Sequence, residues 1–326
     1  MNHAARTAVY KQIESERKTK ILALVTGERV GLETQIARDA VGPFVSLLDQ
    51  IGPTPKISLI LDTNGGQTSA AWRLINLIRS FCDELEVIIP TKAMSAGTLM
   101  ALGADRIVMT KQAALGPIDP SLDGHPLSPE VTGPTGQKLR LSVSAEAIRG
   151  YLDEVKKDVN GPEALASVWM HLANQIHPVV LGDIFRLGGQ IRAMATELIK
   201  RQVPDSAKQA DIIQLLCSDS GSHDFTINRR KAAEIGLNVE KPSAALYGLL
   251  SQIIKSYEGE LATFQPFSFG SLLGGQTQAN FKLVRGLVES SQDCYGFVTE
   301  GTVALNPVNQ QQVNHQTDFE GWRKLP

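Results

Sequence analysis

Ser95 and two pairs of small residues, Gly65-Gly66 and Ala96-Gly97, form the part of this sequence best suited to chemistry. Ser95 lies within Met94-Ser-Ala-Gly-Thr98, and the segment Thr63-Asn-Gly-Gly66 precedes it in the chain. Each segment follows a short apolar run, so both are expected where a strand ends, with a helix beginning near Ser95. The glycines offer backbone N–H donors, and the serine supplies a hydroxyl. A nucleophile beside such donors is the minimum set for acyl transfer.

Both features also have purely structural interpretations. A hydroxyl at the start of a helix is most often an N-cap, which bonds the helix's own backbone. A glycine pair after a strand commonly serves turn geometry. The residues alone leave these alternatives open.

The composition is that of an ordinary globular protein. Of 326 residues, 42% are hydrophobic and 20% are charged, and the net charge of −2 gives no sign of a nucleic-acid or anionic-membrane partner. The cysteines, Cys82, Cys217 and Cys294, lack metal or disulfide spacing, which favours a reducing setting. No apolar run approaches the ~20 residues of a membrane span, and the N-terminus lacks an apolar signal core. We therefore expect a cytoplasmic protein.

Strand and helix patterns alternate, which predicts an α/β fold with a parallel sheet. Buried strands are expected at residues 21–25, 57–61, 87–89 and 107–109, and helices at 4–20, 34–51, 68–82 and 95–103. A long loop over 120–144, with a strand at 138–143, separates these from helices at 145–160, 163–202, 209–218, 229–235 and 243–262. A hairpin is expected from 284–288 and 295–303, followed by a flexible polar tail over 306–326.

Several separated blocks resemble the Clp-protease/crotonase superfamily, and in particular its serine dehydrogenase proteinase branch, which is related to ClpP and to signal peptide peptidase A. The blocks are Thr-Asn-Gly-Gly (63–66), Met-Ser-Ala-Gly-Thr (94–98), Leu-Gly-Pro-Ile-Asp-Pro (115–120), Ile-His-Pro-Val-Val-Leu-Gly (176–182) and Ser-His-Asp-Phe-Thr-Ile-Asn-Arg-Arg (222–230). The resemblance implies a ClpP/crotonase-like spiral of β-β-α units. The resemblance covers roughly residues 20–240 and implies a serine protease core there (21–242). We expect an N-terminal helix (1–20) before this core and a C-terminal α+β extension with a polar tail (243–326) after it.

The resemblance also assigns roles to the first two blocks. It implies that Ser95 is the nucleophile and that the backbone N–H groups of Gly66 and Ala96 form the oxyanion hole. Gly65 would serve turn geometry. Losing one oxyanion donor typically costs on the order of a hundredfold or more in rate, so these positions would be decisive for activity.

The base that takes the proton from Ser95 is left open, and two candidates lie in or near the long loop. Asp119 stands 24 residues after Ser95, where caseinolytic proteases carry a histidine. An aspartate is a feeble base unless buried, and Asp119 is equally interpreted as a turn residue between prolines. His125 is a further candidate in the same loop.

Two more candidates for the base lie further downstream. Lys138 corresponds best to the lysine that signal peptide peptidase A relatives use, and it would have to be desolvated to act. Its alternative is an exposed loop lysine. His223 lies in the block where caseinolytic proteases carry their triad aspartate. Oriented by Asp219 or Asp224, His223 would complete a permuted Ser-His-Asp set. The alternative is that it belongs to a structural turn.

These residues predict a serine endopeptidase that forms an acyl-enzyme at Ser95 within an oligomeric ring, either ATP-independent or fed by a partner. We expect a peptide or unfolded-protein substrate and a homo-oligomer (trimer, hexamer or stacked rings), with an unfoldase partner left open. No nucleic acid, membrane span, metal or cofactor is expected, and no glycine motif supports a dehydrogenase. Two alternatives remain: a non-catalytic oligomeric scaffold, and a crotonase-type acyl-thioester enzyme, which would need no serine.

Overall fold

The computed structural model describes residues 2–118, 120–122, 124–132, 137–159, 161–217, 225–306 and 312–326. The chain forms two compact units. The larger contains Met1–Gly116, Leu198–Pro204 and Thr226–Pro326, and the smaller contains Pro117–Glu197 and Asp205–Phe225. In sequence, the smaller unit is therefore inserted into the larger one.

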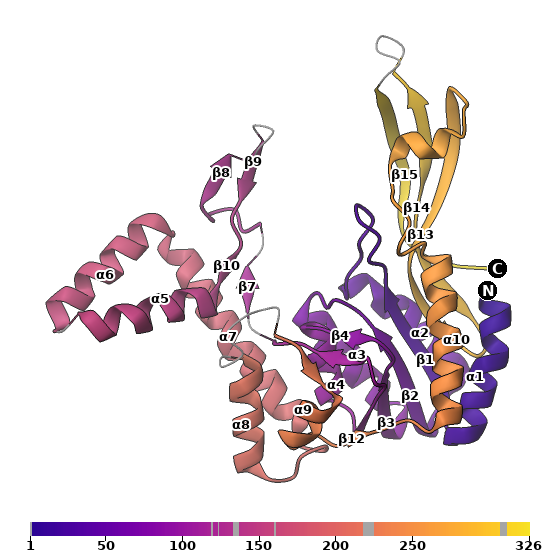
Figure 1. Ribbon diagram of the computed structural model, residues 1–326, viewed down its shortest axis with the longest axis horizontal. Coiled ribbons are helices and arrows are strands. Elements are labelled where there is room, and N and C mark those ends of the chain that lie inside the picture. Colours follow the sequence, from indigo (N-terminus) through magenta and orange to yellow (C-terminus); the bar gives the residue numbers. More distant parts are fainter. Residues whose placement is uncertain are drawn as a thin grey trace. The chain divides into compact units, whose positions relative to one another are not determined.

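An eight-stranded sheet organises the larger unit (Figure 1), with the strand order β12-β5-β3-β2-β1-β13-β14-β15. The first five strands are parallel, and β13, β14 and β15 continue the sheet in antiparallel fashion. The bounds are β1 Lys20–Thr26, β2 Thr54–Asp62, β3 Cys82–Ile89, β5 Arg106–Met109, β12 Val239–Glu240, β13 Gln278–Ser290, β14 Cys294–Leu305 and β15 Val313–Lys324. The predicted parallel strands are confirmed, and so is the predicted hairpin, which is longer than expected.

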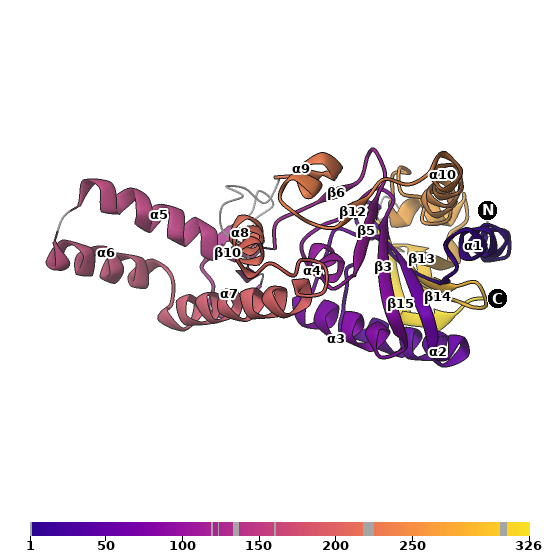
Figure 2. The same ribbon diagram turned by 90° about the horizontal axis from the view of Figure 1, so that it is seen from below.

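Helices cover both faces of the parallel strands (Figure 2). α1 and α10 lie side by side on one face, and α2 and α3 lie on the other. The bounds are α1 His3–Arg17, η1 Arg38–Ala40, α2 Val41–Ile51, α3 Thr68–Arg79, α10 Ala244–Glu260 and η2 Phe269–Leu273. Because both faces are covered, the central strands are apolar almost throughout. Alternate residues such as Ile21, Ala23, Ile60 and Ile88 fill the core beneath α1 and α10.

A smaller sheet, with the order β11-β6-β4, belongs to the same unit. β4 pairs in parallel with β6, and β11 pairs with β6 in the antiparallel direction. The bounds are β4 Lys92–Ala93, α4 Ala96–Leu102, β6 Ala114–Leu115, β11 Ile227–Asn228 and α9 Arg229–Glu234. α4 follows β4 after two residues, so the strand end and the helix start together determine the position of Ser95.

The smaller unit is mainly helical. Its elements are β7 Ser121–Leu122, β8 Glu130–Thr132, β9 Lys138–Arg140, β10 Val143–Ser144, α5 Ala145–Asp158, α6 Pro162–Gln175, α7 Pro178–Ile199 and α8 Ser206–Cys217. The single helix predicted over 163–202 is wrong, because the chain forms two helices there. Pro178 opens α7, and a proline disfavours helical backbone at the residue before it, so His177 ends the preceding segment.

The flexible polar tail predicted over 306–326 is also wrong. Within the described residues of this stretch, 313–324 form β15, which pairs with β14. The Trp322 ring packs edge-on against Phe297 at 5.6 Å, and His315 stacks on Phe269 at 3.7 Å. Much of β15 is exposed, and its residues are correspondingly polar. A polar run gives no hydrophobic pattern from which a paired strand could be predicted.

None of the helices in the described residues is both long and apolar enough to cross a membrane.

Candidate functional site

Ser95 has an unusual backbone conformation, with φ 49° and ψ −112°. Positive φ is rare for residues other than glycine, and such strain costs on the order of 1–3 kcal/mol and clusters at functional sites. The conformation arises where β4 turns abruptly into α4. The Ser95 hydroxyl does not cap α4, and the side chain is only half-buried. The N-cap alternative is therefore not what the structure contains.

The Gly65-Gly66 turn packs directly against the segment that carries Ser95. The two glycines have φ of 108° and 140°. A Cβ atom on Gly65 would lie 2.7 Å from the Met94 carbonyl oxygen, 2.9 Å from the Ser95 Cβ and 3.2 Å from the Ala96 nitrogen. Only glycine fits such a conformation and such a close approach. The absence of a Cβ atom at Gly65 therefore permits both the turn itself and its close packing against Ser95.

The backbone of Ile36 fixes the other side of this turn. The Ile36 N–H donates to the Gly65 carbonyl at 2.7 Å, and the Gln67 N–H donates to the Ile36 carbonyl at 2.8 Å. These bonds use the groups on either side of the Gly66 N–H. Within the part of the chain that the structure describes, neither the Gly66 N–H nor the Ala96 N–H has a hydrogen-bond acceptor. Both predicted oxyanion donors are thus uncommitted.

Thr63 joins the glycine turn to the serine segment. Its hydroxyl accepts a hydrogen bond from the Gly65 N–H at 3.0 Å and one from the Thr26 hydroxyl at 2.8 Å. Its backbone N–H donates to the Lys92 carbonyl at 3.1 Å, and its carbonyl accepts from the Met94 N–H at 3.0 Å. Sequence reasoning missed this residue, although it stands in the Thr-Asn-Gly-Gly block.

Thr98 plays a similar part inside α4. Its buried hydroxyl donates toward the Ala93 carbonyl at 2.7 Å and accepts from the Gly116 N–H at 3.1 Å. Gly97 lets the helix approach Thr63, since a Cβ there would lie 2.6 Å from the Thr63 Cγ2. The small and hydroxyl residues of the Ser-Ala-Gly-Thr block therefore hold the serine turn in place.

Two of the candidate bases, Lys138 and His125, belong to the smaller unit, where each has its own contacts. Lys138 lies on β9 with 80% of its side chain exposed, 3.6 Å from a Glu130 carboxylate oxygen. His125 is engaged at both ring nitrogens: the Nε2 lies 3.5 Å from Asp183, and the Nδ1 accepts from the Leu127 N–H at 3.2 Å.

Four other predicted residues, Asp119, His223, Asp219 and Asp224, lie outside the described residues. Their roles stay predictions.

A cavity of about 250 Å³ opens at the carboxyl ends of β1 and β2, where ligands commonly bind in parallel sheets. Asp62 lines it, directly before Thr63. Burial raises the pKa of the Asp62 carboxyl to about 6, although the Thr91 hydroxyl donates to it. The charged neighbours in the cavity are Glu28, Lys92 and Glu258, and Lys92 pairs with Glu28 at 2.6 Å.

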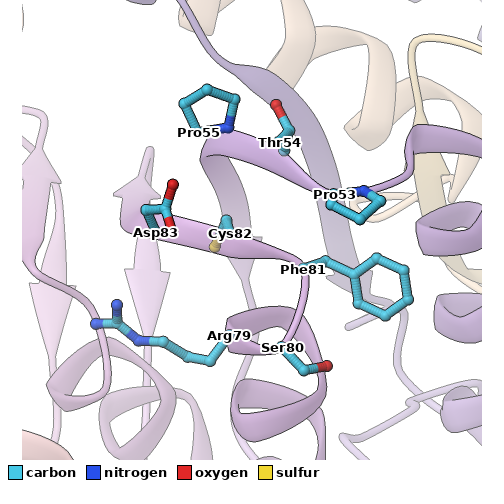
Figure 3. A pocket seen from close by; sticks show the side chains of 8 residues that line it. All are labelled: Pro53, Thr54, Pro55, Arg79, Ser80, Phe81, Cys82 and Asp83. Carbon is cyan, nitrogen blue, oxygen red and sulfur yellow. The ribbon is translucent and has the colours of Figure 1, made fainter.

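A second cavity, of about 380 Å³, lies at the opposite end of β2 and β3 (Figure 3). It contains Cys82, but burial raises the pKa of that thiol to about 11, so little thiolate forms near neutral pH. Arg79 donates to the Gly103 carbonyl and to Asp105. This cavity therefore offers no activated nucleophile.

The fold and the site define a class of protein: an α/β fold with a strained serine at a helix start, beside a glycine turn. Within the described residues, the Gly66 N–H of that turn and the Ala96 N–H have no acceptor. Residues 1–138 match the family described as ClpP-like SDH-type serine proteinases, which confirms the resemblance predicted from the sequence. The ClpP/crotonase-like fold class is confirmed with it. The matched residues include Ser95 and both glycines.

Two uncharacterised proteins of Methanocaldococcus jannaschii are similar over most of the chain. One is 26% identical over 246 residues, covering 72% of this chain and 73% of its own length. The other is 25% identical over 244 residues, covering 72% and 71%. The similarity thus reaches well beyond residues 1–138.

Solved structures show a weaker likeness. The 1510-N membrane-bound stomatin-specific protease aligns with a TM-score of 0.39 and 16% identity, covering 69% of this chain and 81% of that one. ClpP1 from Listeria monocytogenes aligns with a TM-score of 0.38 and 13% identity, covering 72% and 98%.

Proposed function

We propose that this protein is a serine peptidase that cleaves peptide bonds through an acyl-enzyme at Ser95. The Ser95 hydroxyl attacks the scissile carbonyl carbon while a base takes its proton. The Gly66 and Ala96 N–H groups stabilise the resulting oxyanion. The C–N bond then breaks, and the leaving amine takes up the proton. Water hydrolyses the ester in the second half of the reaction.

One observation carries this proposal: the Ser95 hydroxyl is left uncapped in a strained turn directly beside two open backbone donors. A structural serine at this position would bond the first turn of α4 and would occupy ordinary backbone space. An acyl-thioester enzyme of the crotonase type would use the same donors but would have no use for this serine. The geometry therefore favours nucleophilic catalysis.

The base in this proposal is His223, with Asp219 or Asp119 in support, or Lys138. Lysine is a base near neutral pH only when it is desolvated. Since Lys138 is exposed within the single chain, its use as a base would require cover from substrate or from a neighbouring subunit. The two candidate bases can be told apart by substitution. If His223 is the base, His223→Gln should abolish activity and Lys138→Met should not. If Lys138 is the base, the reverse should hold.

We further propose that the protein works as a homo-oligomeric ring in the cytoplasm. A closed chamber would admit peptides or unfolded segments, and folded substrates would require an unfoldase. An isolated ring that rapidly digested folded proteins would contradict this part of the proposal.

Intact-mass spectrometry after treatment with a fluorophosphonate tests the central claim. Wild type should gain one adduct per chain, and Ser95→Ala should gain none. Ser80→Ala is the matched control, because Ser80 is an exposed serine at the end of α3 and should leave labelling unchanged. A well-folded wild type that gains no adduct would refute the peptidase proposal.

The scaffold alternative rests on a specific observation of its own. Lys138 is exposed, and both ring nitrogens of His125 are engaged, so neither is ready to act as a base within the described chain. A scaffold would form the same oligomer but would not react with fluorophosphonates. The labelling experiment separates the two functions.

A further inference from the structure

The C-terminal strands contain a residue that reaches the wall of the candidate oxyanion hole. Arg285 lies on β13, at the point where the pairing of β13 with β14 shifts register between Val284 and Gly286. Such β-bulges redirect a side chain and are common next to active sites. The Arg285 side chain is 15% exposed, so it points largely into the protein rather than into solvent.

Arg285 binds the loop formed by residues 27–36. Its Nε donates to the Leu32 carbonyl at 3.0 Å, and its Nη2 donates to the Glu33 carbonyl at 2.8 Å. The Arg285 carbonyl accepts from the Thr34 hydroxyl at 2.9 Å. That hydroxyl in turn accepts from the Gly27 N–H at 2.8 Å. Arg285 thus binds residues 32–34 of the loop directly, and Gly27 at the start of the loop is held through Thr34.

The 27–36 loop ends at Ile36, which hydrogen-bonds on both sides of the Gly66 N–H. A Cβ atom on Gly66 would lie 2.6 Å from the Ile36 nitrogen, so the two segments are in the closest contact that backbone allows. A shift of Ile36 would therefore move Gly66. Misplacing a group in an active site by about 1 Å can cost on the order of a hundredfold in rate.

Residues of β14 and β15 bind the guanidinium group of Arg285. The Arg285 Nη1 donates to the Thr299 hydroxyl on β14 at 3.0 Å and to the Glu320 carboxylate on β15 at 2.6 Å. The guanidinium carbon lies 5.6 Å from the Phe297 ring centroid, also on β14. All three antiparallel strands of the sheet, β13, β14 and β15, converge on this one side chain.

We propose that Arg285 is a positioning residue for the oxyanion hole, and that the C-terminal strands serve to brace the 27–36 loop against the Gly65-Gly66 turn. This inference rests on the proposed function, because it assigns Arg285 to the reaction at Ser95. The brace itself is a structural claim that can be tested without activity.

The first test measures fluorophosphonate labelling of Ser95 in full-length variants. In Arg285→Met the maximal labelling rate should fall by about tenfold to a hundredfold, with the probe concentration at half-maximal rate unchanged within about twofold. Arg285→Lys should recover part of the rate, since an ammonium can replace one of the donors. Arg323→Met is the matched control: Arg323 lies on β15 and pairs with Glu300 at 2.7 Å, and it should label like wild type.

The second test is amide hydrogen exchange at Ile36 and Gln67, whose N–H groups make the two bonds beside Gly66. Exchange at both should accelerate by about tenfold or more in Arg285→Met and stay unchanged in Arg323→Met. Should Arg285→Met fail to fold, Arg285→Lys and Glu320→Gln test the same contacts.

The outcomes separate the two proposals. No labelling of wild type would refute the peptidase function, and exchange alone would then decide the brace. Labelled wild type together with unchanged rates and exchange in the Arg285 variants would overturn the brace and leave the peptidase standing. Slower labelling with unchanged exchange would also overturn it, because Arg285 would then act by another route.

Discussion

The strained backbone of Ser95 leads to a prediction about stability. Its φ of 49° and ψ of −112° favour glycine, and for a residue with a Cβ atom the cost is on the order of 1–3 kcal/mol. Replacing Ser95 by glycine removes that cost. It also increases the freedom of the unfolded chain, which opposes the gain by about 0.5–1 kcal/mol. The net expectation is a stabilisation of about 1 kcal/mol and a complete loss of fluorophosphonate labelling.

Thermal denaturation at one fixed scan rate measures this effect. A stabilisation of about 1 kcal/mol corresponds to a rise in Tm of about 2 °C for a chain of this size. Ser95→Ala is the essential comparison, because it removes the hydroxyl but keeps the Cβ atom and hence the strain. We expect Ser95→Ala to melt with wild type and Ser95→Gly to melt above both.

A serine in ordinary backbone space provides the control. Ser80 ends α3 with φ −72° and ψ −8°. Ser80→Gly should lower the unfolding free energy by about 0.5–1 kcal/mol, because glycine relieves nothing there and only loosens the unfolded chain. If Ser95→Gly melted at or below Ser95→Ala, the backbone at Ser95 would not be strained, and the main argument for a functional turn would be lost.

Three further predictions concern Asp62, Gly66 and Glu289. Burial raises the pKa of Asp62 from 3.8 to about 6, so wild type loses stability as pH rises through 6. The unfolding free energy of Asp62→Asn should exceed that of wild type by at most about 3 kcal/mol at pH 7.5 and should equal it near pH 3. Denaturant unfolding at a series of pH values measures this difference. Gly66→Ala should abolish labelling and lower the Tm, because its Cβ would lie 2.6 Å from the Ile36 nitrogen. Glu289→Gln should cost at most about 3–5 kcal/mol in denaturant unfolding. It removes the carboxylate partner of buried Arg6 on β13, while Glu260 still pairs with Arg6 at 2.6 Å. A loss below about 1 kcal/mol would contradict this prediction.

Local patterns in the sequence were enough to predict the parallel strands and the helices around them. A strand covered on both faces must be apolar throughout, so runs such as Ile57–Leu61 are distinctive. β15 gave no such signal. Its stability depends on pairing with β14 and on ring contacts from distant residues, and neither is visible in a polar run of twelve residues.

The candidate site was predictable to the same extent. Ser95 and Gly66 stand in short blocks with a recognisable order of residue types, so their proximity could be expected. The strain at Ser95 could not, because it depends on how tightly β4 turns into α4. Arg285 could not be found either: it meets Leu32 only because β13 pairs with β1 and bulges there, and no local pattern marks that contact.

Two residues of β13 have separate roles, one in stability and one in positioning the 27–36 loop. Glu289, near its end, is fully buried and binds Arg6 of α1, while Arg285, at the bulge, binds the 27–36 loop. Glu289 accepts from Arg6 and Tyr10 of α1, and Arg6 in turn donates to Ser256 of α10. In the described part of the chain, none of these bonds involves the 27–36 loop. Loss of Glu289 should therefore lower the Tm while the folded fraction labels at the wild-type rate, and Arg285→Lys should slow labelling with a smaller change in Tm. If both substitutions changed stability and labelling in the same proportion, β13 would be acting only as a structural strand.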